Sequence, residues 1–317
     1  MANFDDMPWH DPRETGTFFS ITPIAAPLPA DDALPDALHV ALFGVLPNTP
    51  DSAGWLSYAV VDASKHPLLP ELLDDLGSRH QSLYDGDTAD QLLEVSPYLV
   101  EITADTPRVL QFFKADTGPG DLWDSQLAVF LRSSAPFDEV RAFLRRFVQV
   151  PDETGTHRFF RFFDPVVLLP YFHSIQGQDR LASPWFSKIP IAFVICSAVL
   201  GETAIVEAQE TADASAEQRV DVDSKILARN HAFLEMQSFA EEQEIPFEPP
   251  LIDSYGYDFT RFSDADIRIV VLLHLYFRKP KRYDPETLYA GQVPDVAKQE
   301  YLNKLLFFKE QKVPLDL

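Results

Sequence analysis

The run RFFRFFDPVVLL, from Arg158 to Leu169, constrains the fold more than any other stretch of the chain. A Phe-rich segment of this length suits a half-buried strand, so a strand is predicted over 158–163. Asp164 and Pro165 then have the residue types of a helix N-cap and a first helical position, which predicts a helix over 166–175. The run therefore predicts a strand that leads directly into a helix, with Asp164 at the joint.

Short apolar runs alternate with helical patterns along the first two thirds of the chain. Further strands are predicted over 55–61, 98–102 and 126–131, and further helices over 35–43, 67–76, 108–114 and 138–148. The helix over 138–148 has the clearest pattern, because apolar residues recur at i, i+3, i+4, i+7 and i+8 from Val140. This alternation favours an α/β (α+β) first lobe with a mixed, mainly buried sheet flanked by helices.

Composition divides the chain into four parts. Residues 1–34 are rich in proline and predict an irregular leader, and residues 35–200 hold the α/β lobe. Residues 201–224 are rich in alanine and acidic residues, which indicates an edge hairpin or a linker. Amphipathic helices predicted over 225–243, 264–277 and 296–309 make residues 225–317 a smaller, all-helical C-terminal lobe.

The charge of the chain limits its partners. With 49 acidic and 26 basic residues, the net charge is −23, so nucleic acid and anionic lipid surfaces are repelled. The apolar runs over 191–200 and 269–277 are too short for the ~20 residues of a membrane span. The N-terminus lacks the basic and apolar regions of a signal peptide. We therefore expect a cytoplasmic protein that binds no nucleic acid and does not insert into membranes.

The only cysteine, Cys196, lies in the apolar run over 191–200. One cysteine forms no intramolecular disulfide, which favours a reducing compartment. The apolar neighbours indicate a buried structural thiol rather than a nucleophile.

No common catalytic motif is present in the sequence. It lacks G-x-S-x-G, H-E-x-x-H, the P-loop and G-x-G-x-x-G, and its histidines are scattered, so no metal or cofactor is expected. Asp62 with His66 and His80 is the best candidate for a hydrolase-like enzyme, because Asp62 ends a predicted strand. Asp164 is a second candidate for a general acid or base. The simpler interpretation is that Asp62 caps a turn and Asp164 caps a helix.

Two further groups of residues have both a binding and a structural interpretation. The side chains of Arg158 and Arg161 suit an anion, or pairing with the many acidic residues of the chain. Five aromatic residues lie in or beside predicted loops: Phe112, Phe113, Trp123, Trp185 and Phe186. Such residues anchor polypeptides when exposed, and otherwise pack in a core.

Four segments carry a resemblance to a known family. They are YAVVDA (58–63), LYDG (83–86), SPYLVE (96–101) and RFFDPVVL (161–168). In this order and at this spacing, they resemble the Tap-type adaptor and chaperone family of bacterial type VI secretion systems, over about residues 38–176. The C-terminal part is similar to the variable helical lobe found in that family.

The resemblance implies a non-enzymatic cytoplasmic adaptor without a cofactor. Such an adaptor binds a secreted toxin effector, usually through its N-terminal region, and helps load it onto a VgrG-type spike protein. We interpret seven motif positions as scaffold: Asp62, Tyr84, Gly86, Pro97, Arg161, Asp164 and Pro165. We expect the five loop aromatics to bind effector or spike. A hydrolase-like enzyme and an acidic structural subunit of a larger complex are the alternatives.

Overall fold

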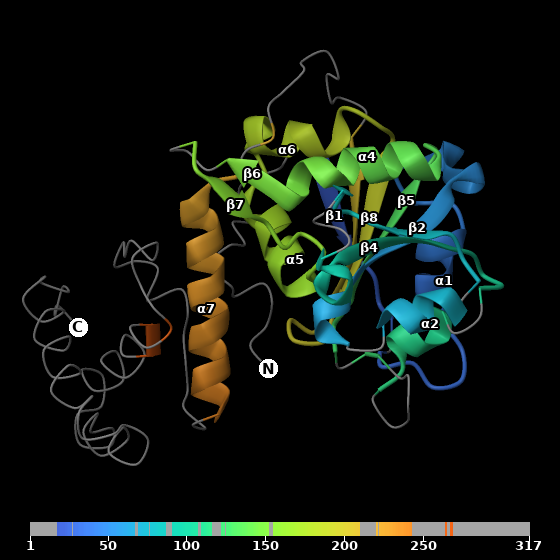
Figure 1. Ribbon diagram of the computed structural model, residues 1–317, viewed down its shortest axis with the longest axis horizontal. Helices are drawn as coiled ribbons and strands as arrows, with labels where there is room; N and C mark the ends of the chain where they lie inside the picture. Colours follow the sequence, from blue (N-terminus) through green and yellow to red (C-terminus); the bar gives the residue numbers. More distant parts are fainter. Residues whose placement is uncertain are drawn as a thin grey trace, which may run out of the picture. The chain divides into compact units, whose positions relative to one another are not determined.

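A computed structural model describes most of the chain up to residue 242 (Figure 1). The described residues are 18–26, 28–66, 69–75, 77–86, 91–106, 109–115, 122–123, 125–151, 155–209, 220, 222–242, 264, 267 and 268. The chain forms two compact units, one of Met1 and Trp9–Asp223, the other of Ala2–Pro8 and Ser224–Leu317. All the strands described below lie in the first unit.

A seven-stranded sheet forms the centre of the first unit, in the order β1-β9-β8-β5-β2-β4-β3. Its strands are β1 (Phe19–Pro23), β2 (Leu56–Asp62), β3 (His80–Ser82), β4 (Pro97–Ile102), β5 (Ala128–Ser133), β8 (Ile191–Ser197) and β9 (Glu202–Ala208). Every neighbouring pair is antiparallel, so the prediction of a mixed sheet is wrong. Hydrophobic periodicity identifies a strand but carries no information on its direction, which depends on the connections between strands.

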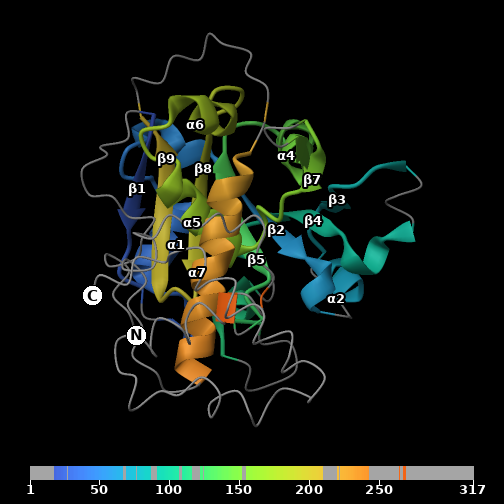
Figure 2. The same cartoon turned by 90° about the vertical axis from the view of Figure 1, so that its left-hand side faces the viewer.

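Helices cover both faces of the sheet (Figures 1 and 2). One face carries α1 (Asp36–Phe43), α2 (Leu69–Asp75) and the 3-10 helix η5 (Val109–Phe113), which share a core with β2, β4 and β5. The other face carries α4 (Phe137–Val148), α5 (Pro165–Ser174) and α6 (Asp179–Phe186). On that face, Tyr58 of β2 contacts Phe137, and Phe193 of β8 contacts Trp185. The two helix layers explain why β5 and β8 are buried along their whole length.

Most predicted elements of the first lobe are confirmed. The structure has α1, α2, α4 and α5, and strands β2, β4 and β5, close to their predicted residues. The weak helix predicted over 108–114 is the 3-10 helix η5. No prediction was made for the strands β1, the three-residue β3, β6 (Gln149–Pro151) and β8, or for the helix α6. Pro184 lies inside α6, and a proline argues against a helix in the sequence because it lacks the backbone N–H donor.

The strand predicted over 158–163 is wrong beyond Phe159. Strand β7 (His157–Phe159) pairs only with β6 (Gln149–Pro151), and the chain then turns. Hydrogen bonds from Phe162 N to Phe160 O (2.9 Å) and from Asp164 N to Arg161 O (3.0 Å) close this turn. The turn lets the consecutive residues Phe162 and Phe163 both face the core, which a strand would prevent.

The outer parts of the first unit also differ from expectation. Strand β1 lies within the leader predicted to be irregular over 1–34, and it forms one edge of the sheet. Of the edge hairpin or linker expected over 201–224, the one described strand is β9, and it pairs with β8 on one side and β1 on the other, so it is an interior strand. Residues 1–17, 210–219 and 221 lie outside the described residues.

The second unit contains the helix α7 (Ser224–Glu242), which confirms the helix predicted over 225–243. Arg268 Nη2 lies 2.6 Å from Glu235 Oε1 of α7, and His231 Nε2 lies 2.9 Å from Asp264 Oδ1. The helices predicted over 264–277 and 296–309 lie outside the described residues, apart from three positions of the first.

Two buried charges attach the α1–β2 connection to the sheet. Arg132 of β5 is fully buried, and its guanidinium donates to the carbonyls of Ala41 (3.2 Å), Gly44 (3.0 Å), Ser52 (3.0 Å) and Trp55 (3.2 Å). Burial lowers the pKa of Arg132.

The second buried charge is Glu207 of β9, which follows Arg132 and Ala192 in one cross-strand row. Its carboxylate accepts hydrogen bonds from Asn48 N (3.3 Å), Asn48 Nδ2 (3.2 Å) and Thr49 Oγ1 (2.9 Å). Arg132 and Glu207 therefore hold the connection at several points, with every contact directed at backbone or at uncharged side chains.

The Arg132→Met variant tests this attachment. We expect it to lower the free energy of unfolding by about 3 kcal/mol, because several buried carbonyls lose their donor. Denaturant unfolding followed by circular dichroism measures the change. Lys114→Met, which removes a partly exposed cation 3.8 Å from Asp32, serves as the control and is expected to cost no more than about 1 kcal/mol. Equal costs for the two variants would contradict the role of Arg132.

Candidate functional site

The four motif segments of the sequence meet at one end of strand β2. Asp62, the last residue of β2, is the register partner of Pro97 at the start of β4. Pro97 O in turn accepts a hydrogen bond from Leu83 N at 2.8 Å. The segment over 161–168 joins through an ion pair between Arg161 and Asp62. Residues far apart in the sequence thus form a single site.

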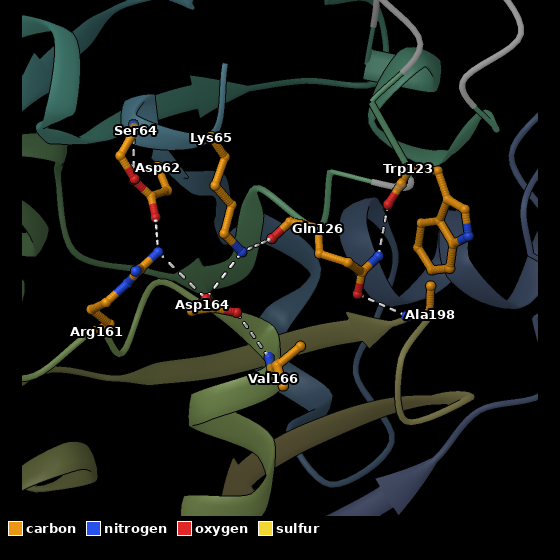
Figure 3. Close-up of polar contacts among 9 residues, drawn as sticks. All are labelled: Asp62, Ser64, Lys65, Trp123, Gln126, Arg161, Asp164, Val166 and Ala198. Atoms are coloured by element: carbon orange, nitrogen blue, oxygen red, sulfur yellow. Dashed lines mark hydrogen bonds and ion pairs between the residues drawn. The ribbon is translucent and has the colours of Figure 1, made fainter. Parts of the chain in front are cut away.

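Asp62 has both carboxylate oxygens occupied (Figure 3). Its side chain is only 1% exposed. Oδ1 accepts from Ser64 N at 3.0 Å and from Ser64 Oγ at 2.6 Å, while Oδ2 accepts from Arg161 Nη2 at 2.7 Å. The bonds to Ser64 cap the 3-10 helix η3 (Ala63–Lys65), so the expected turn cap is confirmed.

Asp164 caps helix α5, as predicted from the Asp-Pro pair. Its Oδ1 accepts from Val166 N at 3.1 Å, and Pro165 occupies the first turn, where a missing N–H costs nothing. Its Oδ2 lies 3.0 Å from Lys65 Nζ and 3.6 Å from Arg161 Nη2. Arg161 therefore bridges two carboxylates, one from the end of β2 and one from the start of α5.

Lys65 extends this network to the turn before β5 (Figure 3). Its Nζ donates to Gln126 O at 2.8 Å. Gln126 is buried with a φ of 48°, a region that non-glycine residues seldom adopt. Its side chain accepts from Ala198 N at 2.7 Å and donates to Trp123 O at 2.8 Å. The two negative charges of the network equal its two positive charges. Hydrogen bonds of the Gln126 side-chain amide hold the end of the network that lies before β5.

The LYDG segment is held by the basic face of α4. Arg141 donates to Ser82 O (2.8 Å), Tyr84 O (3.0 Å) and Asp85 Oδ1 (2.6 Å). Arg145 donates to Leu83 O at 3.1 Å and also pairs with Asp85. The hydrogen bond from Arg141 lowers the pKa of Asp85.

Tyr84 and Gly86 have structural surroundings as well. Gly86 has a φ of 55°, which glycine adopts without strain. Burial, followed by the charge of Asp62, raises the pKa of Tyr84, and the charge of Arg161 opposes this. The ring of Tyr84 lies edge-on to Phe159, with centroids 6.5 Å apart. The seven motif positions thus lie at strand ends and turns or form caps and ion pairs.

Within the described residues, Asp62 and His66 do not form a hydrogen-bonded pair. Both of its oxygens accept from Ser64 or Arg161, and the buried Nδ1 of His66 has no hydrogen-bond partner in the described part of the chain. Within the same residues, no group of three or more His, Cys, Asp or Glu side chains is placed to hold a metal ion. No described helix is long and apolar enough to cross a membrane.

The five loop aromatics are buried, which contradicts the expectation that they form a surface for effector or spike. All are buried: Phe112 (7% exposed), Phe113 (0%), Trp123 (7%), Trp185 (1%) and Phe186 (7%). Trp185 stacks on Phe147 with centroids 3.8 Å apart and contacts Phe172 at 5.2 Å. Phe113 stacks on Phe130 at 4.9 Å on the opposite face of the sheet. Their large apolar area explains this, because removing such side chains from water is strongly favourable.

Residues 57–182 match the model of a family described as Domain of unknown function (DUF4123). The chain carries a DUF4123 domain. Its bounds include all four motif segments and the whole ion-pair network around Asp62, while β1, β8 and β9 lie outside them. No curated protein and no solved structure matches the chain.

Several residues of the DUF4123 domain were missed at the level of sequence. Lys65 is three residues from Asp62, a spacing that suggests a local pair, yet it binds Asp164. Arg141 and Arg145 are visible as a basic face of α4, but nothing in the sequence identifies Asp85 as their partner. Gln126 has no sequence pattern that marks it.

A double-mutant cycle between Asp62 and Arg161 tests the network. We expect Asp62→Ala to lower the free energy of unfolding by about 2–3 kcal/mol, because Ser64 and Arg161 lose their acceptor. The coupling energy with Arg161→Ala should be about 1 kcal/mol, since half of the Arg161 side chain is exposed. Asp138→Ala, which breaks an exposed ion pair with Arg79, is the control and should have a smaller effect. A coupling energy of zero would contradict the bridge.

The reactivity of Cys196 tests whether the core around β8 is closed to solvent. The thiol is buried, and burial raises its pKa to about 12. We expect an aromatic disulfide reagent at mildly alkaline pH to react with native protein at least about a hundredfold more slowly than with denatured protein. Absorbance of the released thiolate measures the rate. Equal rates would mean that Cys196 is accessible in the native state.

Proposed function

We propose that the protein is a non-enzymatic adaptor that binds a type VI secretion effector and helps load it onto a VgrG-type spike. The proposal rests on the resemblance of the four motif segments to the Tap-type family, and the DUF4123 match covers all four. On this proposal the protein acts in the bacterial cytoplasm and needs no cofactor.

The observation that carries the proposal is the satisfied ion-pair network around Asp62. A general acid or base must reach its substrate, whereas the carboxylate oxygens of Asp62 and Asp164 already accept from Ser64, Arg161 and Val166 or pair with Lys65. A network of this kind stabilises the shape of a domain. Its role as scaffold fits a protein that works by presenting surfaces to other proteins.

Affinity purification with the products of the neighbouring genes tests the proposal. The tagged full chain should retain a secreted effector or a spike protein after washing at moderate salt. An effector that lacks its N-terminal region should be lost, because adaptors of the resembled family usually bind that region. An unrelated protein of similar negative charge serves as the control for electrostatic adsorption.

Failure to retain any effector or spike protein would contradict the adaptor role. A turnover that is abolished in an Asp62→Ala variant of native fold would instead favour the hydrolase-like alternative with Asp62 and His66. The thermal transition of the variant, followed by circular dichroism, separates loss of chemistry from loss of fold.

A further inference from the structure

Three exposed apolar side chains lie together in the turn before β4. Leu92 is 36% exposed, Leu93 49% and Val95 46%, and the last two belong to the 3-10 helix η4 (Leu93–Val95). Val95 N donates to Leu92 O at 3.0 Å, an i to i+3 bond that places these two side chains over one another. The turn therefore exposes three apolar side chains within four residues, which we call the η4 patch.

The backbone beneath the η4 patch is fixed by side chains of the third motif segment. Ser96 Oγ donates to Leu92 O at 2.8 Å, and Tyr98 Oη donates to Leu93 O at 3.0 Å. Ser96 and Tyr98 are both buried. A patch held in one conformation loses little conformational freedom when a partner binds, which favours binding.

Acidic side chains lie within η4 and on the neighbouring helix α2, while the cation of η3, which also contacts η4, is Lys65, paired with Asp164. Glu94 lies within the turn, and α2, which contacts η4, exposes Asp74, Asp75 and Glu71. Burial, and then the negative charge of Asp74, raise the pKa of Tyr98, whose hydroxyl donates to Leu93 O. Among the described residues, only His80, with Nε2 3.5 Å from Asp74 Oδ1, pairs with any of these carboxylates.

We propose that the η4 patch and the carboxylates of α2 bind a partner polypeptide segment that is both apolar and basic. Apolar side chains of the segment cover Leu92, Leu93 and Val95, and its lysine or arginine side chains pair with these carboxylates. The inference rests on the proposed function only in identifying the segment as part of the effector.

Charge distinguishes this partner from the other candidates. A second copy of the chain would place one acidic surface against another, and an anionic lipid surface would be repelled in the same way. A basic polypeptide segment is attracted, and the net charge of −23 adds to that attraction at long range.

Peptide binding to the full chain tests the inference. The probe is a labelled amphipathic peptide of leucine and lysine, and its counterpart with glutamate in place of lysine is the peptide control. We expect Leu93→Ser/Val95→Ser to weaken binding of the basic peptide about tenfold, measured by fluorescence anisotropy. Val199→Ser, at a position that is 57% exposed in the turn between β8 and β9, is the matched control and should leave the affinity unchanged.

The acidic side chains are tested separately. The triple variant Glu71→Gln/Asp75→Asn/Glu94→Gln should weaken binding several-fold and reduce its salt dependence, because ion pairs are lost while the shape is kept. Asp31→Asn/Asp51→Asn/Asp105→Asn removes the same charge from exposed positions elsewhere and is the control. Equal affinity of wild type and Leu93→Ser/Val95→Ser, or no binding of the basic peptide to wild type, would overturn the inference.

Effector capture separates this inference from the proposed function. If wild type and the η4 patch variant capture the effector equally well, the inference fails and the adaptor role stands. If no effector is captured but the basic peptide depends on the η4 patch, the adaptor role fails and the binding surface stands.

Discussion

The bridge formed by Arg161 between Asp62 and Asp164 is the constraint on which the DUF4123 domain depends. It joins the end of a central strand to the first turn of α5, which covers one face of the sheet. Charges placed this close to an apolar core are costly unless they are paired, so each member fixes the position of the others. Lys65 contacts both Asp164 and Gln126 O, and so connects the bridge to the turn that leads into β5.

Local features of the fold could be predicted from the sequence because their causes are local. The cap at Asp164 depends on its neighbour Pro165, and α4 depends on a repeat of apolar residues within one helix. The partner of Asp62, in contrast, is 99 positions away, and no pattern in one sequence identifies it. Strand direction was missed for the same reason, since it depends on how the connections cross the sheet.

The burial of the loop aromatics has a consequence for function. The sequence around Trp185 predicts a loop, but Trp185 lies in α6 and packs against Phe147 and Phe172 in an aromatic cluster. Burial depends on total packing rather than on residue type alone. The proposed adaptor role therefore requires side chains that the scaffold leaves exposed, such as those of the η4 patch, whose backbone accepts hydrogen bonds from Ser96 and Tyr98 of the motif segments.

Hydrogen exchange followed by mass spectrometry tests most directly whether the motif residues act as one structural unit. When Asp62 is replaced by alanine, peptides covering residues 62–66 and 161–168 should lose protection together, because Arg161 no longer links them. Peptides from the β8–β9 hairpin should keep theirs. Loss of protection confined to residues 62–66 would contradict the account, since α5 would then be held without the bridge.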